Sequence, residues 1–281
     1  MIYFTKMQGL GNDFIVIDNI EGNVCLSTEE IRQLSDRRFG IGFDQLLMVE
    51  SATTKDVDFR YVIFNADGTE ASQCGNGARC IALYVRKKNL TDKNRITVET
   101  NSRELVLNIN SDDSVRVAMG EPKFTPEEIP FISNDIDAVS GYIPLHYSVE
   151  GFQIGALSIG NPHAVISVND LNLFDVESTA SKLQNSNHFP KGVNVGFMQI
   201  LNKKEIRLRV IERGVGETLA CGSGACAAVI YAQRLGLLQG KVKVHLNGGD
   251  ADVEYGLDEV YLTGPAEFVY EGSINLRSGV S

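Results

Sequence analysis

Two short cysteine-containing segments carry the residues of this chain that are best suited to chemistry. They are residues 74–78 (CGNGA) and 221–225 (CGSGA). After each cysteine, apolar residues recur at offsets of 4, 7, 8 and 11 positions, which is the spacing of one face of a helix. The pattern therefore predicts that Cys74 and Cys221 each begin a buried apolar helix.

A thiol at the start of a helix has a particular electrostatic environment. Unpaired N–H groups and a partial positive charge gather there, so we expect both thiols to have pKa values below the usual value of about 8.5. The same N–H groups can bind a carboxylate, and glycines let the backbone approach it closely. Two such thiols on opposite faces of one α-carbon could remove and return a proton, inverting the centre without a cofactor.

The two segments belong to a duplication of the chain. Gly-Asn pairs at 11–12 and 160–161 precede the cysteines, with Asn161 149 positions after Asn12 and Cys221 147 positions after Cys74. Each interval is close to half of the 281 residues. Features aligned at nearly one period predict two equivalent halves. If the halves pack with pseudo-two-fold symmetry, both helix starts can face one cleft.

Most of the remaining chain has the composition of short strands. The segments expected as strands are 58–65, 95–99, 103–109, 114–119, 205–212, 241–246 and 260–262, and those expected as short surface helices are 29–37 and 176–184. Four prolines (Pro122, Pro126, Pro130 and Pro144) indicate a connection between the halves, and Gly264-Pro265 indicates a second crossing. The prediction is an α+β chain with domains at 1–121, rejoined by 266–281, and 122–265, and with the active site in the cleft between them.

Composition limits the class of protein. The net charge of −10 and the absence of basic runs longer than two residues disfavour a nucleic-acid partner. The longest apolar run, 225–232, is far shorter than the roughly 20 residues of a membrane span. No signal peptide is visible. We therefore expect a cytoplasmic protein whose five cysteines are free thiols.

Other roles for the cysteines are possible from sequence alone. Cys25, Cys80 and Cys226 fit the common case of a small buried core residue. The cysteines and four scattered histidines do not have metal-ligand spacing, so no metal site is predicted. A reversible disulfide or a Cys–His–Asn hydrolase using His163 remains open, although neither explains one cysteine in each copy of a duplication.

Longer motifs around these residues carry a family resemblance. They are 6–14 (KMQGLGNDF), 40–45 (GIGFDQ), 64–70 (FNADGTE), 74–79 (CGNGAR), 160–163 (GNPH), 192–195 (GVNV), 212–218 (ERGVGET) and 220–225 (ACGSGA). In order and spacing the chain resembles the diaminopimelate epimerases over essentially its full length.

The resemblance implies a fold and an activity. The fold would be two pseudo-symmetric domains, each a strand-rich, barrel-like sheet wrapped around a central helix, with the site between them. The activity would be the cofactor-independent interconversion of LL- and meso-diaminopimelate, for lysine and peptidoglycan precursor synthesis. A cytosolic homodimer is also implied, with no nucleic-acid or membrane partner.

The resemblance also assigns roles to positions. Cys74 and Cys221 match the acid/base pair, with Cys74 the proton donor and Cys221 the acceptor in one direction. The reacting carboxylate would be held by the backbone of Gly75, Asn76, Gly222 and Ser223. The substrate-binding positions are Asn12, Gln45, Asn65, Asn161, Asn194, Glu212 and Arg213. His163 and Glu212 match residues that tune the thiols, and Tyr270 matches a dimer contact.

Two departures and several alternatives accompany this assignment. Ser223 stands where the family usually has threonine, and Phe43 stands where it usually has a small residue. Glu70 and Glu217 are expected as local helix-start or turn partners rather than catalysts.

Two alternative functions remain. One is a related two-thiol racemase acting on another amino acid, such as proline, and the other is a thiol-redox sensor or binding module. Arg213, which can pair bidentately with a carboxylate, favours a diamino dicarboxylic substrate.

Overall fold

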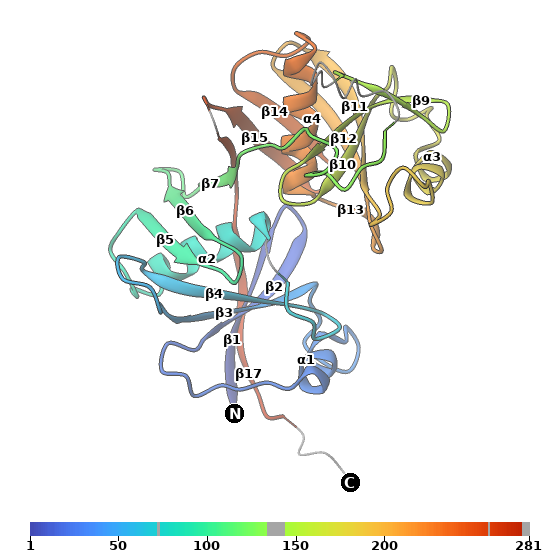
Figure 1. The fold of residues 1–281 in the computed structure, drawn as a ribbon. Coiled ribbons are helices and arrows are strands. Elements are labelled where there is room, and N and C mark those ends of the chain that lie inside the picture. Colours follow the sequence, from blue (N-terminus) through green and yellow to red (C-terminus); the bar gives the residue numbers. More distant parts are fainter. Residues whose placement is uncertain (72–73, 134–143, 258, 277–281) are drawn as a thin grey trace. The chain divides into compact units, whose positions relative to one another are not determined.

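The chain forms two compact units in a computed structural model that describes residues 1–71, 74–133, 144–257 and 259–276. Unit 1 comprises Met1–Val117 and Gly264–Ser281, and unit 2 comprises Ala118–Thr263. The end of the chain thus rejoins the first unit through β17 (Glu267–Ile274), which pairs with β1 (Ile2–Gly9) (Figure 1).

Unit 1 is a mixed sheet with two helices. After β1 and before β17, its elements are β2 (Asn12–Asp18), α1 (Thr28–Ser35), β3 (Gln45–Ser51), β4 (Phe59–Asn65), α2 (Gly75–Lys87), β5 (Arg95–Glu99), β6 (Glu104–Ile109) and β7 (Val115–Gly120), the last of which runs through the unit boundary. Neighbouring strands pair antiparallel except β2–β3 and β4–β5, which are parallel and enclose α1 and α2 as their crossovers.

Unit 2 repeats this arrangement. Its elements are β8 (Tyr147–Val149), β9 (Phe152–Ser158), β10 (Pro162–Ser167), α3 (Val176–Gln184), β11 (Asn194–Asn202), β12 (Glu205–Glu212), β13 (Gly216–Thr218), α4 (Gly222–Arg234), β14 (Val242–Leu246), β15 (Gly249–Tyr255) and β16 (Val260–Gly264). Again two pairings are parallel, β10–β11 across α3 and β12–β14 across α4. The other pairings are antiparallel.

The order of strands and crossovers from β1 to β7 therefore recurs from β9 to β16, with β13 as an added hairpin. The predicted α+β fold of two pseudo-symmetric halves is confirmed. The helices predicted from the apolar spacing after each cysteine are also confirmed. Helices α2 and α4 begin one residue after Cys74 and Cys221.

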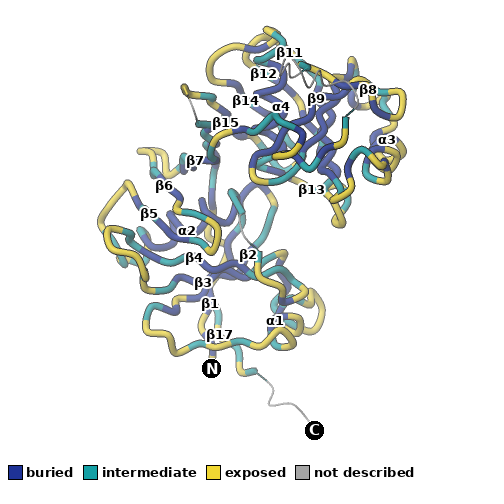
Figure 2. The backbone as a smooth tube through the Cα atoms, viewed as in Figure 1, coloured by how far each residue is buried: buried dark blue, intermediate teal, exposed yellow. Residues whose placement is uncertain are grey.

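Both of these helices are buried on all sides, although their sequences predicted one apolar face. In α2 every residue from Asn76 to Val85 is buried, and in α4 every residue from Gly224 to Ala232 is buried. Helix α2 contacts β1, β2, β3 and β6, and α4 contacts β9, β10, β11, β12 and β15, so each sheet curves around its helix. Figure 2 shows both helices as mostly buried segments of the tube.

Two expectations about the rest of the chain are corrected. Cys25 is exposed rather than buried, because it lies in the loop before α1. Helix α1 ends at Ser35, since Asp36 is already extended. The proline-rich stretch lies in unit 2, where Ile129 and Phe131 join the hydrophobic core, and residues 134–143 of it are outside the described residues. Among the described residues, no helix is long and apolar enough to cross a membrane.

Candidate active site

Strand register gathers three predicted side chains at one edge of the unit 1 sheet. Asn12 is the first residue of β2, Gln45 is the first of β3, and Asn65 is the last of β4. The parallel β2–β3 pair sets Phe14 beside Gln45, and the antiparallel β3–β4 pair sets Gln45 opposite Asn65. Gln45 Nε2 donates to Asn65 Oδ1 at 3.0 Å. The sheet edge thus presents a row of carboxamides.

The Cys74 thiol joins this edge from the start of α2. Cys74 is the N-cap, with extended backbone, and its Sγ accepts a hydrogen bond from the Gly77 N–H at 3.3 Å. Sγ also lies 3.9 Å from Asn12 Oδ1, and Asn76 Nδ2 donates to the same oxygen at 3.2 Å. Unit 1 therefore brings together Asn12, Cys74 and Asn76 as one half-site.

A buried tyrosine contacts the backbone at the start of α2. The Tyr61 hydroxyl donates to the Cys74 carbonyl at 3.4 Å, and burial raises its pKa well above the usual value, so it remains a neutral phenol. A Cβ on Gly77 would approach this hydroxyl to well under 3.0 Å. The second glycine of the CGNGA segment is therefore required by packing, in addition to its place near the thiol.

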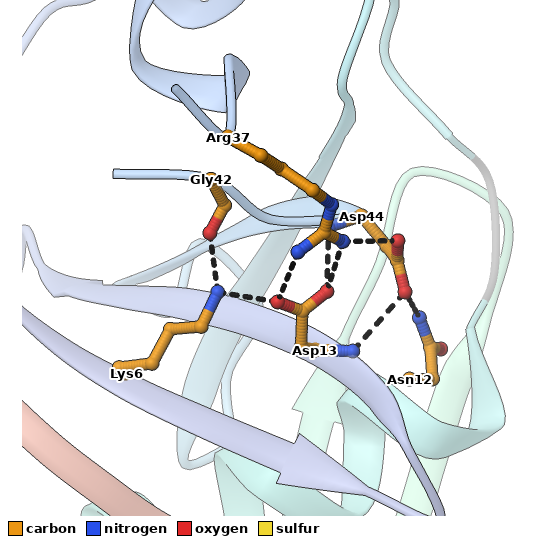
Figure 3. A network of polar contacts seen from close by, with 6 residues as sticks. All are labelled: Lys6, Asn12, Asp13, Arg37, Gly42 and Asp44. Atoms are coloured by element: carbon orange, nitrogen blue, oxygen red, sulfur yellow. Dashed lines mark hydrogen bonds and ion pairs between the residues drawn. The ribbon is translucent and has the colours of Figure 1, made fainter. Parts of the chain in front are cut away.

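Behind Asn12 lies a charged network that the sequence reasoning missed (Figure 3). Arg37 donates to both carboxylate oxygens of Asp13, at 2.9 and 2.7 Å, and to Asp44 Oδ1 at 2.8 Å. Lys6 pairs with Asp13 and donates to the Gly42 carbonyl. The available signal was the presence of both aspartates inside the family motifs at 6–14 and 40–45, next to Asn12 and Gln45.

The network should stabilise unit 1 in a pH-dependent manner. Burial alone would raise the pKa of Asp13, but hydrogen bonds and charges from Arg37 and Lys6 outweigh it and lower the pKa to about 2. A folded-state pKa below the unfolded one gives stability that is present above about pH 4 and is lost as the pH falls toward 2. We expect Asp13→Asn to remove about 1–2 kcal/mol at pH 7, and less at pH 3. Urea unfolding at both pH values tests this; an equal loss at both would contradict it.

Unit 2 builds its sheet edge from the equivalent positions. Asn161 immediately precedes β10, Asn194 is the first residue of β11, and Glu212 is the last of β12. The pairs His163 with Asn194, and Val195 with Ile211, bring these ends together as in unit 1. The Arg213 N–H donates to Asn194 Oδ1 at 2.8 Å, and Thr218 Oγ1 donates to Glu212 at 2.5 Å.

The Cys221 thiol differs from Cys74 in its environment. Cys221 is the N-cap of α4 and is only 5% exposed, with Sγ 3.6 Å from the Ser223 hydroxyl. Burial raises the pKa of Cys221 far above its usual value, and the charge of Glu212 raises it further. The expected lowering of this pKa is therefore wrong for this structure, because desolvation outweighs the hydrogen bonds from the Ser223 hydroxyl and the Gly224 N–H.

This difference predicts unequal reactivity of the thiols. In the ligand-free protein at pH 7.5, iodoacetamide should modify Cys221 at least about tenfold more slowly than exposed Cys25. Glu212→Gln should speed the reaction of Cys221, because it removes the charge that disfavours the thiolate, without bringing it to the rate of Cys25. Peptide mass spectrometry gives the rate at each cysteine. Equal rates of alkylation at Cys221 and Cys25 in the protein without the Glu212 substitution would contradict the burial argument.

His163 is a neutral side chain in the core of unit 2. It is fully buried, which lowers its pKa to about 3, and its Nε2 lies 3.0 Å from Asn161 Oδ1. Because a carbonyl oxygen only accepts, Nε2 carries the proton and donates it. His163 thus orients the Asn161 amide, which is itself one of the predicted substrate-binding groups.

The remaining predicted residues lie as follows. Gly75 and Asn76 open α2, and Gly222 and Ser223 open α4, so each pair supplies helix-start N–H groups. Phe43 is buried in the unit 1 core. Tyr270 on β17 is 47% exposed and contacts Phe4 edge to face at 6.0 Å.

Glu217 has a local partner, as expected, whereas the side-chain partner of Glu70 is distant in sequence. Glu217 makes two hydrogen bonds of 2.7 Å with Arg209 and accepts one from Asn247. Glu70 accepts one from Asn101 at 3.0 Å. Both glutamates therefore have structural partners, although these are of different kinds.

Comparison with solved structures identifies the fold. A phenazine biosynthesis protein of the PhzF family from Bacillus anthracis has a TM-score of 0.69 at 18% identity, covering 98% of this chain and 99% of that one. A probable proline racemase from Agrobacterium radiobacter has a TM-score of 0.67 at 15% identity, covering 98% and 93%. At these identities the likeness shows a shared fold.

Comparison of sequences identifies the family. A sequence profile described as diaminopimelate epimerase matches residues 4–125 and 155–269. A protein named diaminopimelate epimerase from Vesicomyosocius okutanii subsp. Calyptogena okutanii (strain HA) is 53% identical over 277 residues, covering 98% of this chain and all of the relative. Because both matches extend over nearly the whole chain, through both cysteine-capped helices, this chain belongs to the diaminopimelate epimerase family.

Proposed function

We propose that this chain is an isomerase that interconverts LL- and meso-diaminopimelate in lysine and peptidoglycan precursor biosynthesis. The observation that carries the proposal is the 53% identity with a diaminopimelate epimerase along 98% of the chain. The two cysteine-capped helices, one in each unit, support an acid/base role for thiols.

The proposed mechanism uses one half-site from each unit on a single substrate carbon. One thiolate removes the α-proton, and the thiol of the other unit delivers a proton to the opposite face, so configuration inverts. Negative charge that develops toward the carboxylate is stabilised by N–H groups at the starts of α2 and α4, including those of Gly75, Asn76, Gly222 and Ser223. The two thiols then carry both proton transfers, and no pyridoxal phosphate or metal is required.

The rest of the substrate accounts for the other polar residues. Diaminopimelate has a second amino-carboxylate end, and Arg213 offers a guanidinium that matches its carboxylate. Glu212 can accept a hydrogen bond from the distal ammonium, and five carboxamide side chains supply further donors and acceptors. These are Asn12, Gln45, Asn65, Asn161 and Asn194. A racemase acting on a small amino acid such as proline would have no distal charged end for Arg213 to bind.

We further propose a cytoplasmic homodimer. Reduced catalytic thiols require a reducing compartment. On β17, which closes unit 1, Phe268, Val269 and Tyr270 are 36, 56 and 47% exposed, so this strand offers an apolar surface for a second copy. Sedimentation at micromolar concentration should give a dimer, and a monomer would contradict this part of the proposal.

The activity is tested with purified protein and LL-diaminopimelate in deuterated water. The expected result is meso-diaminopimelate with deuterium at the inverted α-carbon, formed without added cofactor and after dialysis against a chelator. L-proline and trans-4-hydroxy-L-proline in parallel reactions should remain unchanged. Turnover of either of these, with diaminopimelate untouched, would replace the proposed substrate.

A further inference from the structure

Asn12 stands between the Cys74 thiol and the charged network of unit 1. Its Nδ2 donates to Asp44 Oδ2 at 2.7 Å, and its Oδ1 faces Cys74 Sγ at 3.9 Å. The carboxylate of Asp44 can only accept hydrogen bonds, so it must face the NH₂ end of the amide. Figure 3 shows Asn12 bound to Asp44 through this NH₂ group, and the amide oxygen is consequently turned toward the thiol.

Asp44 is itself held from three directions. Arg37 Nη2 donates to its Oδ1 at 2.8 Å, the Asp13 N–H donates to its Oδ2 at 3.1 Å, and its own N–H donates to Asp13 Oδ1 at 3.1 Å. Arg37 in turn is paired with Asp13 through two hydrogen bonds. The carboxylate therefore has a fixed position from which to orient Asn12.

We propose that Asp44 is a positioning residue that fixes the Asn12 amide so that its oxygen accepts a hydrogen bond from the Cys74 thiol and thereby favours the protonated form of Cys74. The inference rests on the proposed role of Cys74 as an acid/base group. The Gly77 N–H, 3.3 Å from the same sulfur, serves the opposite state, because it can stabilise the thiolate after the proton has left. The two contacts thus match the two protonation states that Cys74 alternates between.

Other titratable groups near Cys74 in unit 1 do not change charge in the neutral range. They are Tyr61 of β4 and Cys80 of α2, and burial raises the pKa of each well above its usual value. Behind Asn12, hydrogen bonds from Arg37 and Lys6 lower the pKa of Asp13 to about 2 despite its burial, and the hydrogen bond to Asp13 raises the pKa of Arg37, so neither group changes charge in this range. A titration between pH 6 and 10 that follows the reactivity of Cys74 therefore reports on Cys74 itself.

The test replaces the carboxylate with an amide of nearly the same shape. In Asp44→Asn the new oxygen faces Arg37, so the new NH₂ faces the Asn12 NH₂ and the Asp13 N–H and no longer accepts from them. The Asn12 amide then turns, at the cost of the hydrogen bond from Asn76 to its oxygen. Asn12 then presents Nδ2 to the sulfur, which stabilises the thiolate. We expect the pKa of Cys74, read from the pH dependence of its alkylation, to fall by about one unit.

Three controls make the result specific. Cys25, exposed in the same chain, is the internal reference and should keep its pKa. Asp92→Asn removes the same charge from an Arg86 pair beyond the far end of α2, about 20 Å along the helix, and should leave Cys74 unchanged. In an Asn12→Ala background, Asp44→Asn should have no further effect on Cys74, because the residue through which it acts is gone.

Two results would overturn the inference. One is an unchanged Cys74 pKa in Asp44→Asn; the other is the same shift in the presence and in the absence of the Asn12 side chain, which would indicate a simple charge effect. If the Asp44 variant did not fold, the Asn12→Ala chain alone must still show a lowered Cys74 pKa. Alkylation requires no turnover, so these outcomes are independent of whether diaminopimelate is the substrate.

Discussion

Replacing either Cys74 or Cys221 with alanine should reduce the interconversion of LL- and meso-diaminopimelate by about 10³-fold or more. Positioned acid/base groups contribute roughly 10²–10⁴-fold each, and inversion needs one group on each face of the carbon. The loss should be equally severe in both variants, although the thiols differ in burial. Formation of deuterated product from each diastereomer in deuterated water gives the rate.

The matched control is Cys25→Ala, which removes an exposed thiol from the same chain and should keep full activity. Far-ultraviolet circular dichroism and urea unfolding would establish that the variants fold. Cys221→Ala removes a buried sulfur atom and leaves a small cavity, so we expect its free energy of unfolding to fall by about 1 kcal/mol while the fold is kept. Normal epimerisation by a folded variant of either cysteine would refute the two-thiol mechanism.

The largest effect on stability is expected for Gly77→Ala, at about 3 kcal/mol of unfolding free energy. The added methyl group would approach the Tyr61 hydroxyl far more closely than any normal contact, and Tyr61 is 1% exposed and cannot move aside without disturbing the core. The gain of up to about 1 kcal/mol in helix propensity does not offset this. Urea unfolding of the unsubstituted protein and of Gly77→Ala measures the difference in unfolding free energy.

Two further variants test the cause. Tyr61→Phe removes the clashing oxygen, so Tyr61→Phe with Gly77→Ala should recover most of the lost stability. Gly224 holds the same place in the CGSGA segment, but a Cβ there would meet Val210 at 3.0 Å, so Gly224→Ala should cost only about 1 kcal/mol or less. Equal losses at the two glycines would show that a shared backbone requirement, rather than Tyr61, is responsible.

These predictions reflect a general asymmetry between two units of similar topology. Each thiol has a helix N–H beside it, from Gly77 or Gly224, but Cys74 is partly exposed beside an amide oxygen, whereas Cys221 is buried beside a carboxylate and a hydroxyl. The equivalent asparagines are also held differently, Asn12 by Asp44 and Asn161 by His163. Duplication preserved the strand order, while the side chains around each thiol diverged.

The sequence by itself determined the duplication, the helices after Cys74 and Cys221, and seven of the 17 strands in the described residues. These features depend on local spacing: apolar periodicity sets the helices, and β-branched and aromatic runs set the strands. The strands that begin at Asn12 and Gln45 were not predicted, so the register that gathers Gln45 and Asn65 was seen only in the structure.

Only the tertiary structure decided how each site residue behaves. The pKa of Cys221 rises because residues distant in the chain bury it, and no local pattern reports that burial. Arg37 reaches Asp13 across 24 positions of sequence, and Asp44 reaches Asn12 across 32. Local patterns determine which element a residue joins, whereas protonation and side-chain orientation depend on contacts that exist only after the sheet has closed around its helix.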